Sequence, residues 1–175
     1  MKKSILALVL GAALTACAGP DLADHARQTP VLDLRQYFDG RVVAHGMVRN
    51  RQGKVLRRFV VTMDCSWTPE GVGTLREEFR FDDGERQQRI WQIRRTADGR
   101  WTGTAADVLG QAEGEAAGSA FHWRYTLKLS VDGSVYEVQF DDWMYRIDEE
   151  TVINTAEMRK FGVKVGEVVL AFRRP

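Results

Sequence analysis

Two adjacent aspartates, Asp141 and Asp142, lie within the stretch FDDWMYRID, which otherwise has the aromatic residues typical of a β-strand. Neighbouring strand residues point to opposite faces, so a regular strand would turn one carboxylate toward a core and the other toward water. A buried carboxylate is costly unless it is paired or hydrogen-bonded. Together with Asp107 and a histidine, His45 or His122, the pair could carry out general acid-base chemistry.

Other patterns for catalysis or metal binding are weak in this sequence. Cys65 has no basic neighbour that would activate its thiol, and the chain lacks a Gly-x-Ser-x-Gly motif. The three histidines are scattered without the spacing of zinc ligands. Asp148, Glu149 and Glu150 could suggest calcium, but they lack the EF-hand spacing, and we interpret them as a solvated turn. We predict no metal and no cofactor.

The elements that must position these side chains show a period of two almost throughout. Apolar and polar residues alternate from 121 to 131, from 55 to 67 and from 75 to 81, with shorter β-like runs at 41–49, 87–95, 101–106, 135–147 and 164–173. Tight-turn dipeptides separate many of these runs: Asp83-Gly84, Asp98-Gly99 and Asp132-Gly133. This pattern predicts an all-β fold, an antiparallel up-and-down barrel of about 8 to 10 strands.

The hairpin around Asp83-Gly84 does not follow simple parity. A two-residue turn would place Phe79 on the same face as Gln88 and leave Trp91 on the other face. A bulge or an odd-length loop would restore a common apolar face. Glu77 belongs to the same inward set, so we predict a polar group inside the barrel or at its rim.

The segment 103–120, GTAADVLGQAEGEAAGSA, is rich in glycine and alanine. A phosphate-binding loop would need a Gly-Lys-Ser/Thr ending and a following helix, and neither is present. We interpret the segment as two short, strongly bent strands in which small residues allow close backbone approach.

The apolar parity changes across Asp141-Asp142, from even positions at 136–140 to odd positions at 143–147. A β-bulge at the pair is the simplest device that would produce this change, and bulges are common at barrel rims. We therefore predict that the polar residues Asp107, Arg124, Asp141 and Asp142 lie at the rim of a pocket, where they fix structure and do not perform chemistry.

The N-terminal residues have the order of a bacterial lipoprotein signal peptide. A basic start precedes an apolar run of about a dozen residues, too short for the roughly 20 that span a bilayer. Leu14-Thr15-Ala16 before Cys17 resemble a lipobox, in which the cysteine is joined to diacylglycerol after cleavage; the alternative is an ordinary secretory signal. Ala18, where an aspartate would favour inner-membrane retention, favours the outer membrane.

We therefore predict a signal peptide at 1–16, a lipidated tether at 17–30 and a single barrel domain at 31–175, anchored at the periplasmic face of the outer membrane. Cleavage would remove Lys2 and Lys3 from the 25 basic residues, leaving 23 against 24 acidic ones. A near-neutral chain has no electrostatic footprint for nucleic acid. Cys65 shares a strand face with Phe59 and Val61, so we expect a buried, inert thiol in a monomeric protein.

Several blocks of the sequence resemble a family of uncharacterised proteobacterial lipoproteins known only as a domain of unknown function. The blocks are YFDGRVVAHGMV, FVVTMDCSW, GTLREEFRFDDGE, GTAADVLGQAEGEAAGSAFHWRYTL, FDDWMYRID and INTAEMRKFGVKVGEVVLAF. The resemblance covers essentially the whole mature domain. It implies a lipocalin-like (calycin-like) barrel at the outer membrane or in the periplasm, and it implies no activity.

Three functional hypotheses follow. The first is a barrel that binds an apolar ligand such as a fatty acid or lipid, because barrels of about eight strands can hold one small ligand. The predicted pocket residues are Phe59, Val61, Phe79, Trp91, Trp123, Tyr125 and Leu127. The same side chains could fill a solid core in a structural or interaction protein of the envelope. A barrel-pocket enzyme that uses carboxylates as acid or base is the third hypothesis.

Overall fold

The computed structural model describes residues 19–131 and 133–174. The predicted signal peptide and the predicted lipidation site, Cys17, lie outside these residues. Within the described part of the chain, no helix is long and apolar enough to cross a bilayer.

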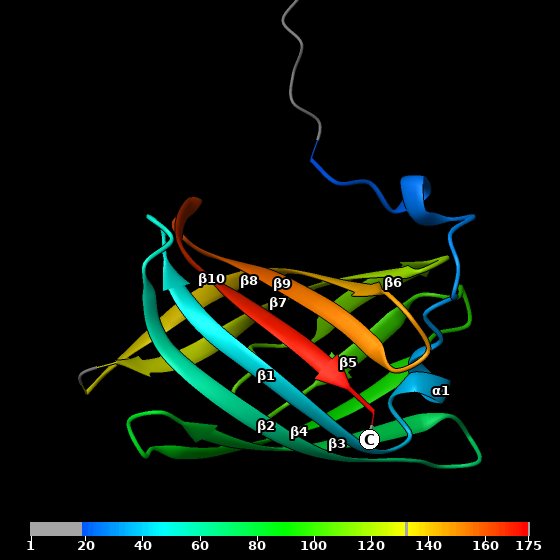
Figure 1. The fold of residues 1–175 in the computed structure, drawn as a ribbon, viewed down its shortest axis with the longest axis horizontal. Helices are drawn as coiled ribbons and strands as arrows, with labels where there is room; N and C mark the ends of the chain where they lie inside the picture. The colour runs from blue at the N-terminus through cyan, green and yellow to red at the C-terminus, as the bar shows by residue number, and fades with distance from the viewer. Residues whose placement is uncertain (1–18, 132, 175) are drawn as a thin grey trace, which may run out of the picture.

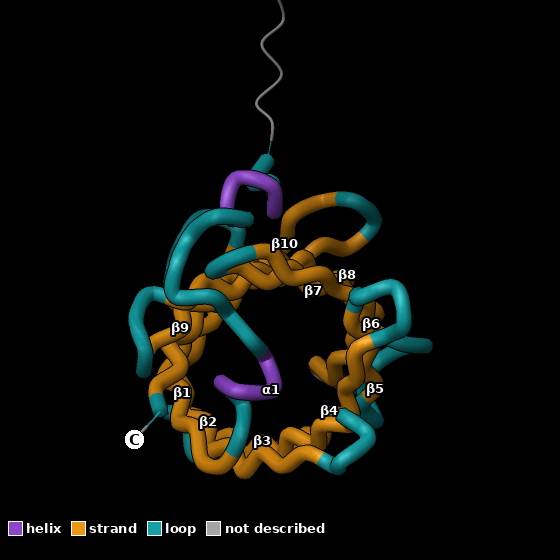
Figure 2. The backbone as a smooth tube through the Cα atoms, turned by 90° about the vertical axis from the view of Figure 1, so that its right-hand side faces the viewer, coloured by secondary structure: helices purple, strands orange, loops and turns teal. Residues whose placement is uncertain are grey.

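Ten antiparallel strands follow one another around a closed barrel, and the last strand pairs with the first (Figures 1 and 2). The predicted all-β up-and-down barrel is confirmed. The strands are β1 (Gly40–Asn50), β2 (Val55–Trp67), β3 (Val72–Phe81), β4 (Arg86–Arg95), β5 (Trp101–Thr104), β6 (Ala112–Ala117), β7 (Ala120–Val131), β8 (Ser134–Arg146), β9 (Thr151–Lys160) and β10 (Val163–Arg173).

Strand β9 was not among the predicted runs. Its buried positions are Val152, Asn154 and Ala156, so a polar side chain interrupts the apolar alternation. The period-two signal is therefore weak, although the strand pairs with β8 and β10 over almost its whole length.

The β3–β4 hairpin has the odd-length loop that parity required. Arg80 pairs with Arg86 across the loop, and farther along the hairpin Leu75 pairs with Trp91. Glu77 pairs with Arg89 on the same face, so the predicted inward position of Glu77 is confirmed, and Arg89 is brought inside with it.

The glycine- and alanine-rich segment 103–120 contains the end of β5 and the whole of β6, so the prediction of two short strands within it is confirmed only in part. Their glycines pack against one indole ring, because a Cβ at Gly103 would lie only 2.8 Å from the ring of Trp123. Gly114 approaches the same ring from β6. Small residues therefore let the barrel wall pass close to Trp123.

Strand β8 runs regularly through the aspartate pair. Trp123 pairs with Asp142 and Arg124 with Asp141, and the pairing with β9 is equally unbroken. The predicted β-bulge is therefore wrong. Asp142 faces the barrel interior, and Asp141 faces outward.

The aromatic residues that suggested a change of parity, Trp143 and Tyr145, face outward and form an outer cluster with His122 that other residues cover. Trp143 stacks on His122, with ring centroids 4.0 Å apart. The helix η1 (Leu22–His25) lies over this outer cluster, and His25 approaches Tyr145 with ring centroids 5.2 Å apart. Ser119 also donates a hydrogen bond to Gln28. Residues of the predicted tether therefore pack on the barrel wall.

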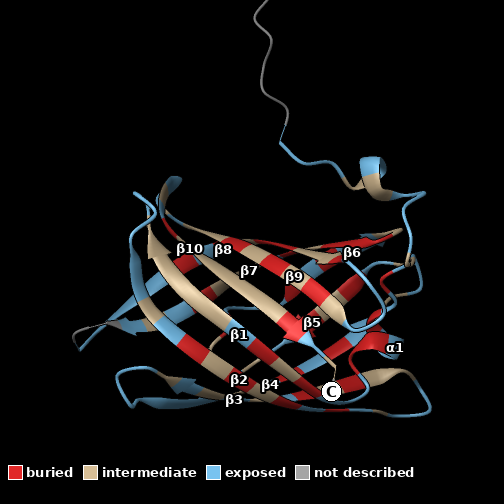
Figure 3. Ribbon diagram, in the orientation of Figure 1, coloured by how far each residue is buried: buried red, intermediate tan, exposed pale blue. Residues whose placement is uncertain are grey.

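A short helix, α1 (Leu34–Tyr37), closes one end of the barrel (Figure 2). Asp33 caps it by accepting a hydrogen bond from the Gln36 amide. This plug, α1 with Phe38, buries Leu34, Tyr37 and Phe38 and exposes Arg35 and Gln36. Figure 3 accordingly shows α1 partly in the buried and partly in the exposed colour. Its buried residues join the apolar core, so this end of the barrel is sealed.

Tyr37 locks the plug to the barrel. Its hydroxyl donates to the carbonyl of Glu150 at 2.8 Å and lies 3.2 Å from that of Phe172. Burial raises the pKa of Tyr37 to about 12, so the hydroxyl keeps its proton and remains a donor.

We expect Tyr37→Phe to lower the free energy of unfolding by about 0.5 to 1.5 kcal/mol, because the hydroxyl's bonds to the carbonyls of Glu150 and Phe172 are lost while the Glu150 carbonyl keeps the Arg174 amide as a donor. Denaturant unfolding measures the change. Tyr136→Phe, at a residue that is 38% exposed, is the matched control and should stay within about 0.5 kcal/mol of wild type. Equal effects at the two positions would show that the plug bond contributes nothing.

Candidate functional site

The barrel encloses a cavity of about 350 Å³ between the plug and the opposite end. This volume lies within the range of small-molecule pockets. Leu34 and Phe38 of the plug segment line it together with side chains from most of the strands. All seven predicted pocket residues are among the lining: Phe59, Val61, Phe79, Trp91, Trp123, Tyr125 and Leu127.

Interlocked aromatic rings make one wall of the cavity. Trp91 packs edge-on against Tyr125, with ring centroids 5.4 Å apart, and against Trp123 at 6.0 Å. Tyr125 stacks on Phe140 at 5.1 Å. Such contacts restrict ring motion, so this wall is preorganised.

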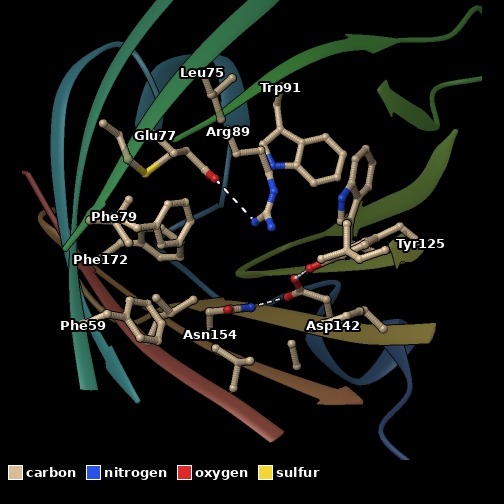
Figure 4. A pocket seen from close by; sticks show the side chains of 18 of the residues that line it. Phe59, Leu75, Glu77, Phe79, Arg89, Trp91, Tyr125, Asp142, Asn154 and Phe172 are labelled. Carbon is tan, nitrogen blue, oxygen red and sulfur yellow. Dashed lines mark hydrogen bonds and ion pairs between the residues drawn. The ribbon is translucent and has the colours of Figure 1, made fainter. Parts of the chain in front are cut away.

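Asp142 is the buried carboxylate of the aspartate pair and points into the cavity (Figure 4). The Tyr125 hydroxyl donates to it at 2.9 Å, and the side-chain amide of Asn154 donates to its other oxygen. Asn154 also donates to the carbonyl of Trp143 at 2.9 Å, which fixes the amide. Burial raises the pKa of Asp142 to about 7, although the hydrogen bonds from Tyr125 and Asn154 oppose the shift.

A second set of polar side chains lies around Arg89, which reaches into the cavity from β4 (Figure 4). Its guanidinium binds Asp107 through two nitrogens, with Nε at 2.9 Å and Nη2 at 2.7 Å from Oδ2. Nη1 lies 3.8 Å from Oε2 of Glu77, and that oxygen has no hydrogen-bond partner among the described residues. Burial raises the pKa of Glu77 to about 7, opposed by the charge of Arg89.

The four residues predicted at a common rim are not all brought together: among them only Arg124 and Asp141 meet as a pair, with Nε of Arg124 3.5 Å from Oδ2 of Asp141. Asp142 lies in the cavity, and Asp107 reaches Arg89 from the segment between β5 and β6. Arg124 and Asp141 face outward, because β7 and β8 pair without a bulge. The prediction of one rim cluster is therefore wrong.

Asp141 belongs to the outer cluster. It accepts a hydrogen bond from the Trp143 indole at 2.9 Å and lies 3.0 Å from Nε2 of His122. His45 is exposed on β1. The acid-base hypothesis thus gains a histidine beside Asp141 on the outer wall, away from the cavity.

The remaining chemical candidates have structural roles. Cys65 is buried as predicted, and burial raises the pKa of its thiol to about 12. Asp148 accepts hydrogen bonds from the amides of Glu150 and Thr151, as expected of a turn. Across residues 19–131 and 133–174, no group of three or more His, Cys, Asp or Glu side chains is arranged to hold a metal ion.

Sequence reasoning missed several polar residues of the cavity lining, among them Arg89 and Asn154. The odd-length β3–β4 loop did carry a signal for Arg89, since it reverses the parity of β4 and turns Arg89 inward. Asn154 carried none, because β9 itself was not recognised.

The pH dependence of stability follows from the two raised pKa values. Glu77 and Asp142 have ordinary values of 4.5 and 3.8 and titrate near 7 when folded. Between about pH 4 and pH 7 the native state therefore binds more protons than the unfolded chain does. The stability that these two carboxyl groups contribute is fully present below about pH 4 and is lost as the pH rises through about 7.

We expect the free energy of unfolding to fall between about pH 5 and pH 8, and to fall less in Asp142→Asn, which has no proton to lose. At about pH 5 the substitution should also cost about 1 to 3 kcal/mol, because Tyr125 and Asn154 both donate to this side chain. Denaturant unfolding across pH tests this. Asp141→Asn on the outer face is the control and should keep most of the fall. An identical slope in wild type and Asp142→Asn would contradict the assignment.

The barrel is similar to the crystal structure, at 1.75 Å resolution, of a protein of unknown function from the DUF3598 family of Nostoc punctiforme. The TM-score is 0.52 at 11% identity, over 85% of this chain and 51% of that one. This chain thus spans about half the length of that protein, and the likeness concerns the fold alone. No curated protein matches the sequence. The family model described as protein of unknown function (DUF3833) matches residues 11–174, and the chain therefore belongs to the DUF3833 family.

Proposed function

We propose that the barrel binds one apolar, lipid-like molecule in its cavity. The observation that carries this proposal is a space of about 350 Å³, lined mainly by apolar and aromatic side chains, inside a barrel sealed at one end by the plug. Apolar walls with a few placed polar groups are typical of ligand pockets. A solid core would fill such a space, because empty volume costs packing energy.

The polar groups of the cavity favour a ligand that offers a hydrogen-bond donor. Among the described lining residues the two cations are already paired, Arg89 with Asp107 and Arg57 with the carboxylates of the β3–β4 loop. Two buried atoms of these lining side chains still have no hydrogen-bond partner among the described residues: Nε of Arg57, which is a donor, and Oε2 of Glu77, which is an acceptor. A hydroxyl, or the protonated carboxyl of a fatty acid, would satisfy this oxygen, whereas an ionised carboxylate would be repelled.

We also propose that the chain is a lipoprotein of the outer membrane with its barrel in the periplasm. The support is the order of basic start, apolar run and Leu14-Thr15-Ala16-Cys17 in the sequence. Gly19, two residues after Cys17, is the first described residue and leads into the segment packed on the barrel wall. A lipid anchor would hold the cavity close to a source of apolar ligand.

We expect Val168→Phe to weaken the binding of N-phenyl-1-naphthylamine, a neutral fluorescent probe, by about tenfold or more, because the ring would occupy the cavity. Val168 lines the cavity, and the next residue, Val169, faces the outer surface of the same strand. Val169→Phe is therefore the matched control and should bind the probe as wild type does. Undiminished binding in a folded Val168→Phe would place the probe elsewhere and defeat the proposal.

Competition with the probe in the same assay shows which polar group of a ligand, a hydroxyl or a carboxylate, the cavity binds better. At about pH 8, hexadecanol should displace the probe at lower concentration than palmitate does, because palmitate is ionised and faces Glu77. Glu77→Gln should narrow this difference by removing the negative charge. A stronger displacement by palmitate in the wild type would contradict the donor argument.

We expect Cys17→Ser to abolish lipid attachment and to leave the chain unprocessed or mislocalised. Membrane fractionation and the mass of the N-terminal peptide measure both effects. Cys65→Ser, at the buried cysteine, is the control and should not alter fractionation. Normal processing and membrane association of Cys17→Ser would refute the anchor.

A further inference from the structure

Exposed apolar side chains gather at the end of the barrel opposite the plug. They lie on the β1–β2, β7–β8 and β9–β10 hairpins, which are neighbours around the barrel because β1 pairs with β10 and β8 with β9 (Figure 1). Scattered surface hydrophobes need no explanation, but a cluster of them on adjacent hairpins beside an opening does. The residues are Val55, Leu56, Val135, Tyr136, Phe161, Val163 and Val165.

Phe161 at the tip of the β9–β10 hairpin is the most prominent of these residues. Its side chain is 92% exposed, so it adds nothing to the core. It also has a φ of 52° and is followed by Gly162 with a φ of 77°, within a two-residue turn that joins the pair Lys160 and Val163. Such turns prefer asparagine at the first position, and a bulky aromatic residue is an outlier there. Neither packing nor turn geometry therefore accounts for this phenylalanine.

Basic residues accompany the apolar ones. The ammonium of Lys160 lies 3.8 Å from the ring centroid of Tyr136 and 5.3 Å from that of Phe161, which links two of the hairpins. Lys54 lies in the β1–β2 turn, whereas Lys164, which follows the β9–β10 turn, is paired with Glu157 at 3.0 Å. The β3–β4 hairpin is different, since its loop carries acidic residues that bind arginines of β2. The apolar and basic character is thus confined to one side of the opening.

The cavity extends to this opening. Val48, Met158 and Val168, near the ends of β1 and β9 and at the facing part of β10, are among its lining residues. A molecule that leaves the cavity here would emerge among the exposed side chains of the three hairpins.

We propose that the β1–β2, β7–β8 and β9–β10 hairpins dock the barrel on an anionic phospholipid bilayer. Phe161 and its apolar neighbours enter the headgroup region, and the lysines contact lipid phosphates. The cavity then opens onto lipid. This docking concerns the surface alone and would occur whether or not the cavity holds a ligand.

Stability separates a docking role of Phe161 from a structural one. Phe161→Asn replaces the aromatic residue with the one that this turn prefers, so the midpoint of denaturant unfolding should rise or stay unchanged. Docking should weaken by about tenfold, because an apolar side chain no longer enters the lipid. A variant that is less stable would show that Phe161 supports the fold.

Docking can be measured on the complete chain with an environment-sensitive dye on an introduced cysteine. Gln52→Cys places the dye in the exposed β1–β2 turn, and Asp83→Cys places it in the acidic β3–β4 loop as the matched control. Cys65 is buried, and Cys17→Ser in every labelled chain removes both the other thiol and the proposed lipid anchor, so that contact with vesicles reports the hairpins. Vesicles of phosphatidylcholine, with or without phosphatidylglycerol and with nitroxide-labelled lipid as quencher, report contact.

With phosphatidylglycerol present, the dye at position 52 should shift to shorter wavelength and be quenched, whereas the dye at position 83 should change much less. Adding Phe161→Asn should reduce the docked fraction, and Lys54→Gln with Lys160→Gln should reduce it by about fivefold for each lysine. High salt should act in the same direction. Equal quenching at positions 52 and 83, or none at either, would overturn the proposal.

Two further results keep this proposal distinct from ligand binding. Without vesicles, Phe161→Asn should bind N-phenyl-1-naphthylamine as wild type does, because the residue lies outside the cavity lining. Light scattering should show a monomer without lipid. A dimer that disappears in Phe161→Asn would show that a second copy of the chain covers the hairpins, and would overturn docking on lipid.

Discussion

Closure of the sheet by hydrogen bonds between β1 and β10 is the constraint on which the rest of the structure depends. In a closed antiparallel barrel, a strand that slipped by one residue would turn all its side chains to the wrong face. Inward positions are therefore strongly specified, including those that hold polar residues. Glu77, Arg89, Asp142 and Asn154 lie inside because the register puts them there, and burial makes each polar group costly unless it finds a partner.

The interior polar residues divide into a satisfied group and an incomplete one. Asp142 receives hydrogen bonds from Tyr125 and Asn154, and this set needs no further partner. Arg89 is neutralised by Asp107, which leaves Glu77 with only a distant approach to the guanidinium. The incomplete group therefore gives the cavity a place where a hydrogen-bond donor of a ligand would find a buried acceptor, while Nε of Arg57 is a second lining atom without a partner among the described residues.

The two ends and the outer wall of the barrel have different surfaces. The plug closes one end through Tyr37, while apolar and basic hairpins lie on one side of the other. On the outer wall, the N-terminal segment covers aromatic residues of β8. If the anchor and the docking surface are both established, packing of this segment would limit how the opening can approach the membrane.

Period-two alternation and turn dipeptides were sufficient to predict an all-β barrel, because each strand contributes its own local pattern. They also indicated that Phe59, Trp91 and Trp123 share one face, that Glu77 lies inward and that Cys65 is buried. Local pattern failed at β9 and at the aspartate pair. In both places the strand keeps its register, but its side chains do not alternate between apolar inside and polar outside. In β9 the polar Asn154 is buried, and in β8 the apolar Trp143 lies on the outer face, where other residues cover it.

Only the tertiary structure decided which residues meet. The sequence by itself determined the class of fold, the inward set of aromatic residues and the candidate lipobox, since these depend on residues close together in the chain. The pairing of Arg89 with Asp107, the sealing of one end by α1 and the gathering of three hairpins around the opening join residues that are distant along it. They depend on strand order, loop parity and closure, which act between segments and leave no periodic signal in any one of them.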